Sequence, residues 1–223
     1  MKAQHMTNKR IWDLPVRLSH WGLALSFFGA YMTSEGPLIW MHIPFAYALV
    51  TLALFRIFWG LFGSENARFS HFVRGYGAVK AYTAELKELR HKEYWGHNPV
   101  GALAILAILL ISIALVVAAV FAQGRGIAGP WAGDVARQTS GLMTDVHILL
   151  ANLLMTIVIV HIGAVVAYKY VLQDNLITPM ITGTRPASPE QREPHFTSIA
   201  VAVVLLALAA AITSYAFRYW GLA

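Results

Sequence analysis

Long runs of apolar residues, separated by short polar segments, dominate this chain. A helix that crosses the hydrocarbon core of a bilayer, about 30 Å thick, needs about 20 apolar residues. The first apolar run, at 19–33, is short unless residues 14–18 extend it. It lacks a cleavage site of the A-x-A kind, so we expect a span rather than a signal peptide. In all we expect five transmembrane helices, at residues 19–33, 41–62, 99–121, 146–168 and 196–217. The pattern predicts an all-α, polytopic transmembrane helical bundle.

Lysines and arginines are unevenly distributed among the polar segments, and this predicts the orientation. Positively charged loops stay in the cytoplasm. The segment between the first two spans has no Lys or Arg, and Arg125, Arg137 and Arg218 are the few on the same predicted side. We therefore expect a cytoplasmic N-terminus and an external C-terminus. The basic residues on the predicted cytoplasmic side are Lys2, Lys9, Arg10, Arg17, Arg68, Arg74, Lys80, Lys87, Arg90, Lys92, Lys169, Arg185 and Arg192.

The second polar loop contains a further helical pattern. Residues 78–92 are good helix formers, with Leu86 and Leu89 near Tyr82 on one side. This pattern favours a short amphipathic helix that lies on the cytoplasmic surface. A solvated charged loop is the alternative interpretation.

Composition narrows the chemistry. The chain of 223 residues is 57% hydrophobic and 13% charged, against roughly 25% charged for a typical soluble domain. It has no cysteine, which excludes Cys-ligated Fe–S clusters, zinc thiolate sites, disulfides and haem attached through C-x-x-C-H. The positive charge is divided among loops, which indicates topology rather than a nucleic-acid surface.

Histidines inside the spans are the strongest functional signal. Four of the nine histidines lie in or at the edges of spans: His20, His42, His147 and His161. An ionisable residue in a span is costly, so it usually faces the bundle interior and has a function. His147 and His161 are 14 residues apart, which is nearly four turns and about 21 Å of helix rise. The two side chains therefore share one helix face at two depths.

Depth divides the four histidines into two pairs. His20 and His161 lie at the inner, cytoplasmic level, and His42 and His147 lie at the outer level. Each pair can supply two axial imidazoles to one haem iron. Two axial ligands leave no open coordination position, so such haems transfer electrons. Structural histidines, a proton relay and a transition-metal transporter remain alternatives.

Other residues near these histidines suit a haem site. Trp21, Phe27 and Phe28 are candidates to pack a porphyrin, and Gly22, Gly29 and Gly163 are candidates to let a macrocycle approach the backbone. These six are candidates by position only.

Three basic side chains are further candidates for cofactor contact. Arg17 lies three residues before His20, and Arg56 lies in the inner part of the second span. Each arginine either pairs with a haem propionate or snorkels to the anionic inner surface. His97 precedes an Asn-Pro helix start and is either a capping-region residue or a contact to a propionate or a quinone.

Four motifs, in order along the chain, carry a family resemblance. They are the run IWDLPVRLSHW at 11–21, GHNP at 96–99, the two-histidine stretch 147–161, and DNLITPMITG at 174–183. Over residues 11–185 the chain resembles the bacterial membrane b-type cytochromes that include cytochrome b561 and the cytochrome b subunit of Ni,Fe-hydrogenases. The resemblance implies a four-helix bundle with two b haems, each held by two histidines among His20, His42, His147 and His161.

The resemblance also implies a function. Electrons would pass between a quinone and a periplasmic partner, such as a c-type cytochrome, a redox enzyme subunit or a small redox substrate, across the bacterial inner membrane. A free-standing oxidoreductase that oxidises superoxide with a quinone acceptor is one form of this. The chain departs from the four-helix pattern at residues 196–217, so we expect a di-haem domain at 1–185 and an additional C-terminal span at 186–223.

Two other function classes remain open from the residues. A metal or proton transporter would use the same histidines, and a structural anchor would pair helices through the Ala-rich fifth span. The outer loop at 123–145, with Trp131, Asp134, Arg137 and Asp145, is either a docking surface for a periplasmic partner or a connector.

Overall fold

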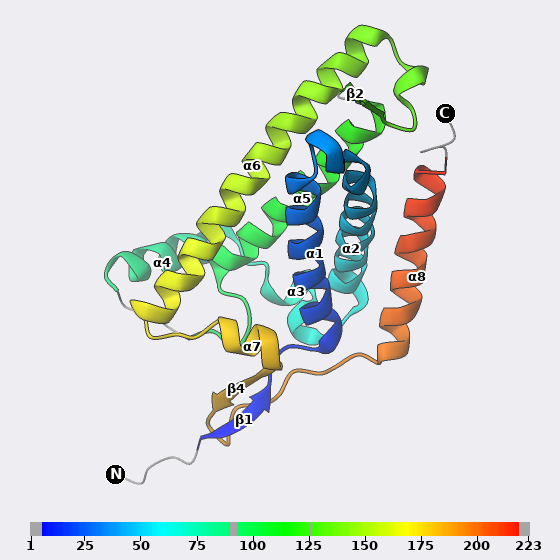
Figure 1. Cartoon of the computed structure of the whole chain (residues 1–223). Helices are drawn as coiled ribbons and strands as arrows, with labels where there is room; N and C mark the ends of the chain where they lie inside the picture. Colours follow the sequence, from blue (N-terminus) through cyan, green and yellow to red (C-terminus); the bar gives the residue numbers. More distant parts are fainter. Residues whose placement is uncertain (1–5, 90–92, 125, 219–223) are drawn as a thin grey trace.

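The computed structural model describes residues 6–89, 93–124 and 126–218. The chain forms a bundle dominated by five long helices (Figure 1). They are α1 (Leu14–Met32), α2 (His42–Phe62), α5 (Pro99–Phe121), α6 (Arg137–Tyr170) and α8 (Ile199–Ala216). The short helices are η1 (Gly36–Met41), η2 (Glu65–Ala67), α3 (Phe69–Phe72), α4 (Tyr76–Lys87), η3 (Ala132–Asp134) and α7 (Ile177–Thr182). The strands are β1 (Thr7–Arg10), β2 (Gln123–Gly124), β3 (Ile127–Ala128) and β4 (Thr184–Ala187).

Side-chain caps explain where two of the helices begin. The Asp13 carboxylate accepts a hydrogen bond from the Val16 amide at 2.7 Å, and Pro15 lies in the first turn of α1. The Asn98 side chain accepts one from the Gly101 amide at 2.7 Å, and Pro99 is the first residue of α5. Each cap satisfies an amide that has no partner within its helix. Residues 14–18 therefore extend the first predicted span.

Four helices among the described residues are long and apolar enough to cross a membrane. They are Gly36–Phe62, Pro99–Phe121, Arg137–Tyr170 and Ile199–Ala216. The first predicted span, α1, has 19 residues but is not in this set. Helix α6 begins nine residues before the predicted span at 146–168. Its first turns are polar and precede the apolar segment.

The core consists of two helix pairs that meet around one apolar cluster. Helix α1 packs along α2, and α5 packs along α6. Phe27, Leu49, Leu115 and Leu154 are buried where the two pairs meet. Past this cluster, the second half of α6 exposes Ile159, Val160, Ile162 and Val166. Figure 1 shows α6 crossing the bundle obliquely, away from α1.

A small ribbon and several short helices close one end of the bundle, which we call the ribbon end. Strand β1 pairs antiparallel with β4, from Thr7 opposite Ala187 to Arg10 opposite Thr184. Helix α4 is the predicted amphipathic helix, and Tyr82 on its buried face is hydrogen-bonded to Tyr168 of α6. Residues 90–92, in the last part of that prediction, lie outside the described residues.

Helix α8 packs on α2, on the right of Figure 1. Its buried residues are small: Ala202, Ala209 and Thr213. The Tyr47 hydroxyl of α2 forms a hydrogen bond with Ser214 of α8. Small residues let helices approach closely inside a membrane.

Candidate functional site

The outer histidine pair is brought together as the sequence predicts. The rings of His42, at the start of α2, and His147, on α6, have centroids 6.2 Å apart at an angle of 75°. His42 Nδ1 lies 2.8 Å from the Ala30 carbonyl oxygen, and His147 Nδ1 lies 3.0 Å from that of Leu115. A carbonyl only accepts, so both Nδ1 atoms are the donors. The Nε2 lone pair of each ring is then free to bind a metal.

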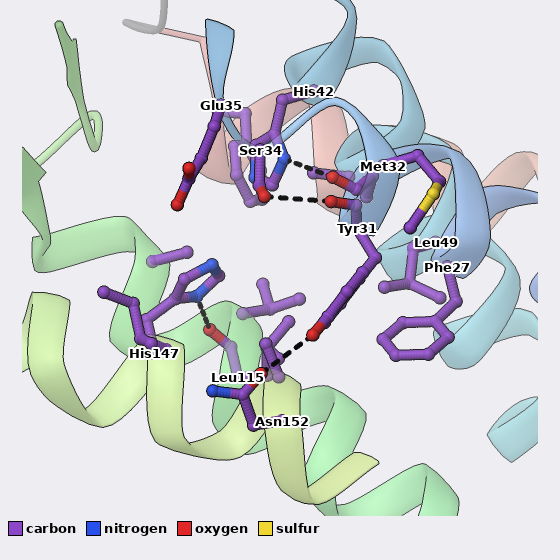
Figure 2. A pocket seen from close by; sticks show the side chains of 17 residues that line it. Phe27, Tyr31, Met32, Ser34, Glu35, His42, Leu49, Leu115, His147 and Asn152 are labelled. Carbon is purple, nitrogen blue, oxygen red and sulfur yellow. Dashed lines mark hydrogen bonds between the residues drawn. The ribbon is translucent and has the colours of Figure 1, made fainter. Parts of the chain in front are cut away.

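A cavity of about 470 Å³, the outer cavity, lies beside these rings. Figure 2 shows the two histidines with their hydrogen bonds to the backbone. The Tyr31 hydroxyl of α1 donates to Asn152 Oδ1 of α6 at 3.0 Å, and this bond links two helices that otherwise have few contacts. The side chains that line the cavity are mostly apolar and include Phe27, Met32, Glu35, Leu49, Leu115 and Ile148.

These features fit a haem at the outer level. The cavity volume is in the range of sites that bury a cofactor-sized ligand, about 300–1,000 Å³. Metal–imidazole bonds are about 2 Å long, so two of them can fit between rings whose centroids are 6.2 Å apart. The backbone carbonyls also fix the orientation of both ligands, as second-shell partners of metal-binding histidines do.

The inner pair is less ordered by its neighbours. His20 on α1 and His161 on α6 are close enough for their charges to interact. His20 Nδ1 is buried and has no hydrogen-bond partner among the described residues. His161 is exposed, on the half of α6 that packs against little else. A macrocycle between the two helices would bury both rings, so the residues fit a haem that completes the packing.

Two predicted small-residue contacts have a different role. A Cβ on Gly22 would lie 2.7 Å from a Leu52 methyl, and one on Gly29 would lie 2.5 Å from the Phe45 ring. These glycines therefore let α2 approach α1, and the prediction that they face a macrocycle is wrong. A Cβ on Gly163 would meet nothing within 4 Å. Among the aromatic candidates, Phe27 lines the outer cavity, Trp21 donates to the Met180 carbonyl at 3.2 Å, and Phe28 is 37% exposed.

The two arginine side chains donate hydrogen bonds to backbone carbonyls. Arg17 Nη1 donates to the Ile181 carbonyl at 3.0 Å. Arg56 is only 6% exposed and donates to the Ala67 carbonyl at 3.2 Å. Of the two interpretations of Arg56, snorkelling to the inner surface does not fit this burial, because the segment with Ala67 covers that end of α2. The buried Asp13 carboxylate supplies a compensating negative charge.

His97 lies between two aromatic rings at the ribbon end. Its ring centroid is 4.6 Å from that of Trp12 and 4.5 Å from that of Phe72. Burial lowers the pKa of His97 to about 3, and the positive charge of Arg56 acts in the same direction. A second cavity, of about 220 Å³, is lined by His97, and we call it the His97 cavity. Its other lining residues are Asn66, His71, Phe72, Arg74, Tyr94, Trp95, Gly96 and Pro99.

Several of these features have no signal in the residue pattern. The carbonyls of Ala30 and Leu115 belong to the backbone, which no residue pattern reveals. The Tyr31–Asn152 bond joins residues 121 positions apart. Asp13, which also accepts a hydrogen bond from Trp59 Nε1 at 3.0 Å, had a local signal, since an aspartate before Leu-Pro is a typical helix cap.

Comparison with known proteins gives a consistent picture. Residues 11–183 match the family model described as prokaryotic cytochrome b561. Proteins named probable Ni/Fe-hydrogenase B-type cytochrome subunit are similar to this chain. Those of Azotobacter chroococcum mcd 1 and Azotobacter vinelandii are 28% and 27% identical, over 82% of this chain and 91% of each relative. That of Rhodobacter capsulatus is 24% identical, over 84% of this chain and 85% of the relative. The chain therefore belongs to the prokaryotic cytochrome b561 family, as a multi-pass bacterial membrane protein that carries electrons through haem b.

Proposed function

We propose that this chain conducts electrons across the membrane through two b haems. His42 and His147 would hold the outer haem, and His20 and His161 the inner one. The observation that supports this most is the arrangement of the outer pair: two rings 6.2 Å apart, each anchored through Nδ1 to a carbonyl. When bound, each haem supplies a one-electron couple between ferric and ferrous iron, and the protein supplies ligands and apolar packing.

The apolar cluster between the two histidine levels supports a continuous path. Phe27, Leu49 and Leu154 are buried there and join α1, α2 and α6. They exclude water between the two levels and hold the helices that carry the four ligands. We propose that α1 also spans the membrane, since it packs along α2 and carries one inner ligand.

We propose a periplasmic redox enzyme or cytochrome as one partner and the quinone pool as the other. Relatives named as hydrogenase cytochrome subunits support a redox enzyme. The predicted positive-inside orientation puts the ribbon end in the cytoplasm. The His97 cavity is the site we propose for the quinone head, because His97 is close enough to His20 for their charges to interact. Residues 1–185 would form the haem domain, with 186–223 as an additional helix.

The decisive experiment is a reduced-minus-oxidised spectrum of the purified, detergent-solubilised chain, with a pyridine haemochrome count. We expect a low-spin b spectrum and about two haems per chain, because each pair supplies two axial imidazoles. One haem per chain would contradict the two-site proposal. A folded chain without haem, expressed with haem supplied, would contradict the function and favour a transporter that uses the same histidines.

A further inference from the structure

Quinone chemistry needs a route for protons as well as electrons. Reduction of a quinone to a quinol takes up two electrons and two protons, and oxidation releases them. The haem path carries only the electrons. This inference rests on the proposed quinone site in the His97 cavity, and it concerns how protons reach that cavity.

His97 is poorly placed to exchange protons with water directly. Its ring lies between Trp12 and Phe72, and its Nδ1 is buried without a partner among the described residues. The ring forms a hydrogen bond with the Asn66 backbone, and a backbone carbonyl takes the ring's single N–H when the ring is neutral. Its Nδ1 then offers a lone pair for a proton, and the ring lines the cavity.

His71 connects the same cavity to water. It lies on α3, next to Phe72, and both residues line the His97 cavity. Its side chain is 40% exposed. The cavity, about 220 Å³, has room for water between the two histidines. Imidazole is the side chain that most readily gains and loses a proton near neutral pH.

The charged groups around His71 suit a side chain that alternates between two protonation states. Its Nδ1 lies 3.9 Å from Glu65 Oε1, on η2. The pKa of Glu65 is lowered by hydrogen bonds from the His195 amide and Arg192, so Glu65 stays a carboxylate. Glu65 can therefore form an ion pair with a protonated His71. Arg74 lines the same cavity and opposes a second positive charge there, and Arg56 and His20 do so on the His97 side.

We propose that His71 transfers protons between the aqueous phase and the His97 cavity during quinone turnover. For reduction, the imidazolium of His71 gives one proton toward the cavity and takes another from water. It does this twice for each quinone, and the bound haems would supply the two electrons. Oxidation of a quinol runs the same exchange in reverse, with two protons released to water.

The test uses the full haem-loaded protein in detergent. The haems are reduced anaerobically with stoichiometric dithionite and mixed with a short-chain benzoquinone in a stopped-flow instrument, from pH 5.5 to 9. His71→Asn removes the imidazole at a partly exposed position. His195→Asn is the matched control, because His195 is an exposed histidine beside Glu65 that does not line the cavity. Added imidazole tests chemical rescue.

For the wild type and His195→Asn we expect haem reoxidation to slow as pH rises from 5.5 to 9, because less imidazolium is present to give a proton. His71→Asn should reoxidise at least about tenfold more slowly near pH 6, since loss of a general acid usually slows a reaction by about 10²–10⁴-fold. It should lose that pH dependence and recover partly with imidazole, while its haem spectrum and its reduction by dithionite stay unchanged.

Two results would overturn the inference. One is a His71→Asn rate and pH profile equal to those of the wild type. The other is a slower rate with the wild-type pH profile and no rescue by imidazole, which would indicate a structural defect. If wild-type ferrous haems are not reoxidised by the quinone at all, the proposed quinone link itself fails, and this is distinct from a failure at His71.

Discussion

The outer and inner histidine pairs share helix α6 but differ in how much protein structure supports them. At the outer level, carbonyls of Ala30 and Leu115 hold both rings, and helices pack around a formed cavity. At the inner level, His20 Nδ1 has no partner among the described residues, and His161 is exposed. The difference teaches that the polypeptide preorganises the outer site, while the proposed inner site would depend on its cofactor for packing.

The largest effect on this comparison is expected when one proposed ligand histidine is replaced at a time. His147→Ala and His161→Ala should each lower the haem count from two to one per chain, since one imidazole is lost from each iron. His161→Ala should leave the outer spectrum unchanged, because that cavity is closed by packing that does not involve His161. Pyridine haemochrome counts and redox titrations measure both effects. His195→Ala, an exposed histidine outside both pairs, should keep two haems. Two haems in His147→Ala would contradict the proposed ligation.

Glycine substitutions compare the packing of the two levels directly. Gly29→Ala puts a Cβ into the Phe45 ring, so we expect a loss of about 1–3 kcal/mol of stability from overpacking. Gly163→Ala meets nothing within 4 Å, and alanine favours a helix over glycine by about 1 kcal/mol. We therefore expect no loss of stability there in the haem-free chain. Thermal unfolding in detergent measures both variants. Equal destabilisation would show that the inner half of α6 is as tightly packed as the outer end of α1.

The bond between Tyr31 and Asn152 tests the preorganisation of the outer cavity. Tyr31→Phe removes the hydroxyl and leaves the ring, so we expect a loss of about 0.5–1.5 kcal/mol. Because the bond joins α1 to α6 beside the outer cavity, haem uptake by the outer site should slow, as followed by absorbance after haem is added to haem-free protein. Tyr82→Phe is the control, since its hydroxyl bonds to Tyr168 at the ribbon end and Tyr82 does not line the outer cavity. Identical uptake by the two variants would refute this role.

Acid should weaken the ribbon end. Burial lowers the pKa of His97 to about 3, below its ordinary value of 6.5. The unfolded chain therefore binds more protons than the folded chain between these values, so this contribution to stability is lost as pH falls from about 6.5 toward 3. Thermal unfolding from pH 7 to 4 should show a steeper fall for the wild type than for His97→Phe. Parallel curves would contradict a buried neutral His97.

Much of the fold could be read from the chain because membrane helices satisfy their own backbone groups. Apolar length therefore predicted four spans that have the required length and composition, and Asn98-Pro99 marked the start of α5. Helix α1 was harder, since Arg17, Ser19 and His20 lower its apolar character. Its first turn lies before the apolar run, and the Asp13 side chain stabilises that turn by capping it.

The candidate site divides in the same way. Helical periodicity alone put His147 and His161 on one face of α6, because the rotation per residue is fixed. That His42 reaches His147 depends on how two helix pairs meet around Phe27, Leu49 and Leu154, which no local pattern encodes. The burial of Arg56 was missed for the same reason, since its cover comes from a loop that folds back over α2.

The sequence by itself determined the helices, the spacing of the histidines along α6 and the absence of cysteine chemistry. Those properties follow from composition and from the fixed geometry of one helix. Only the tertiary structure decided which carbonyls hold each ring, which glycines face α2, and that the outer cavity is formed while the inner pair remains open. Those features depend on contacts between residues far apart in the chain, whose positions are fixed when the helices pack together.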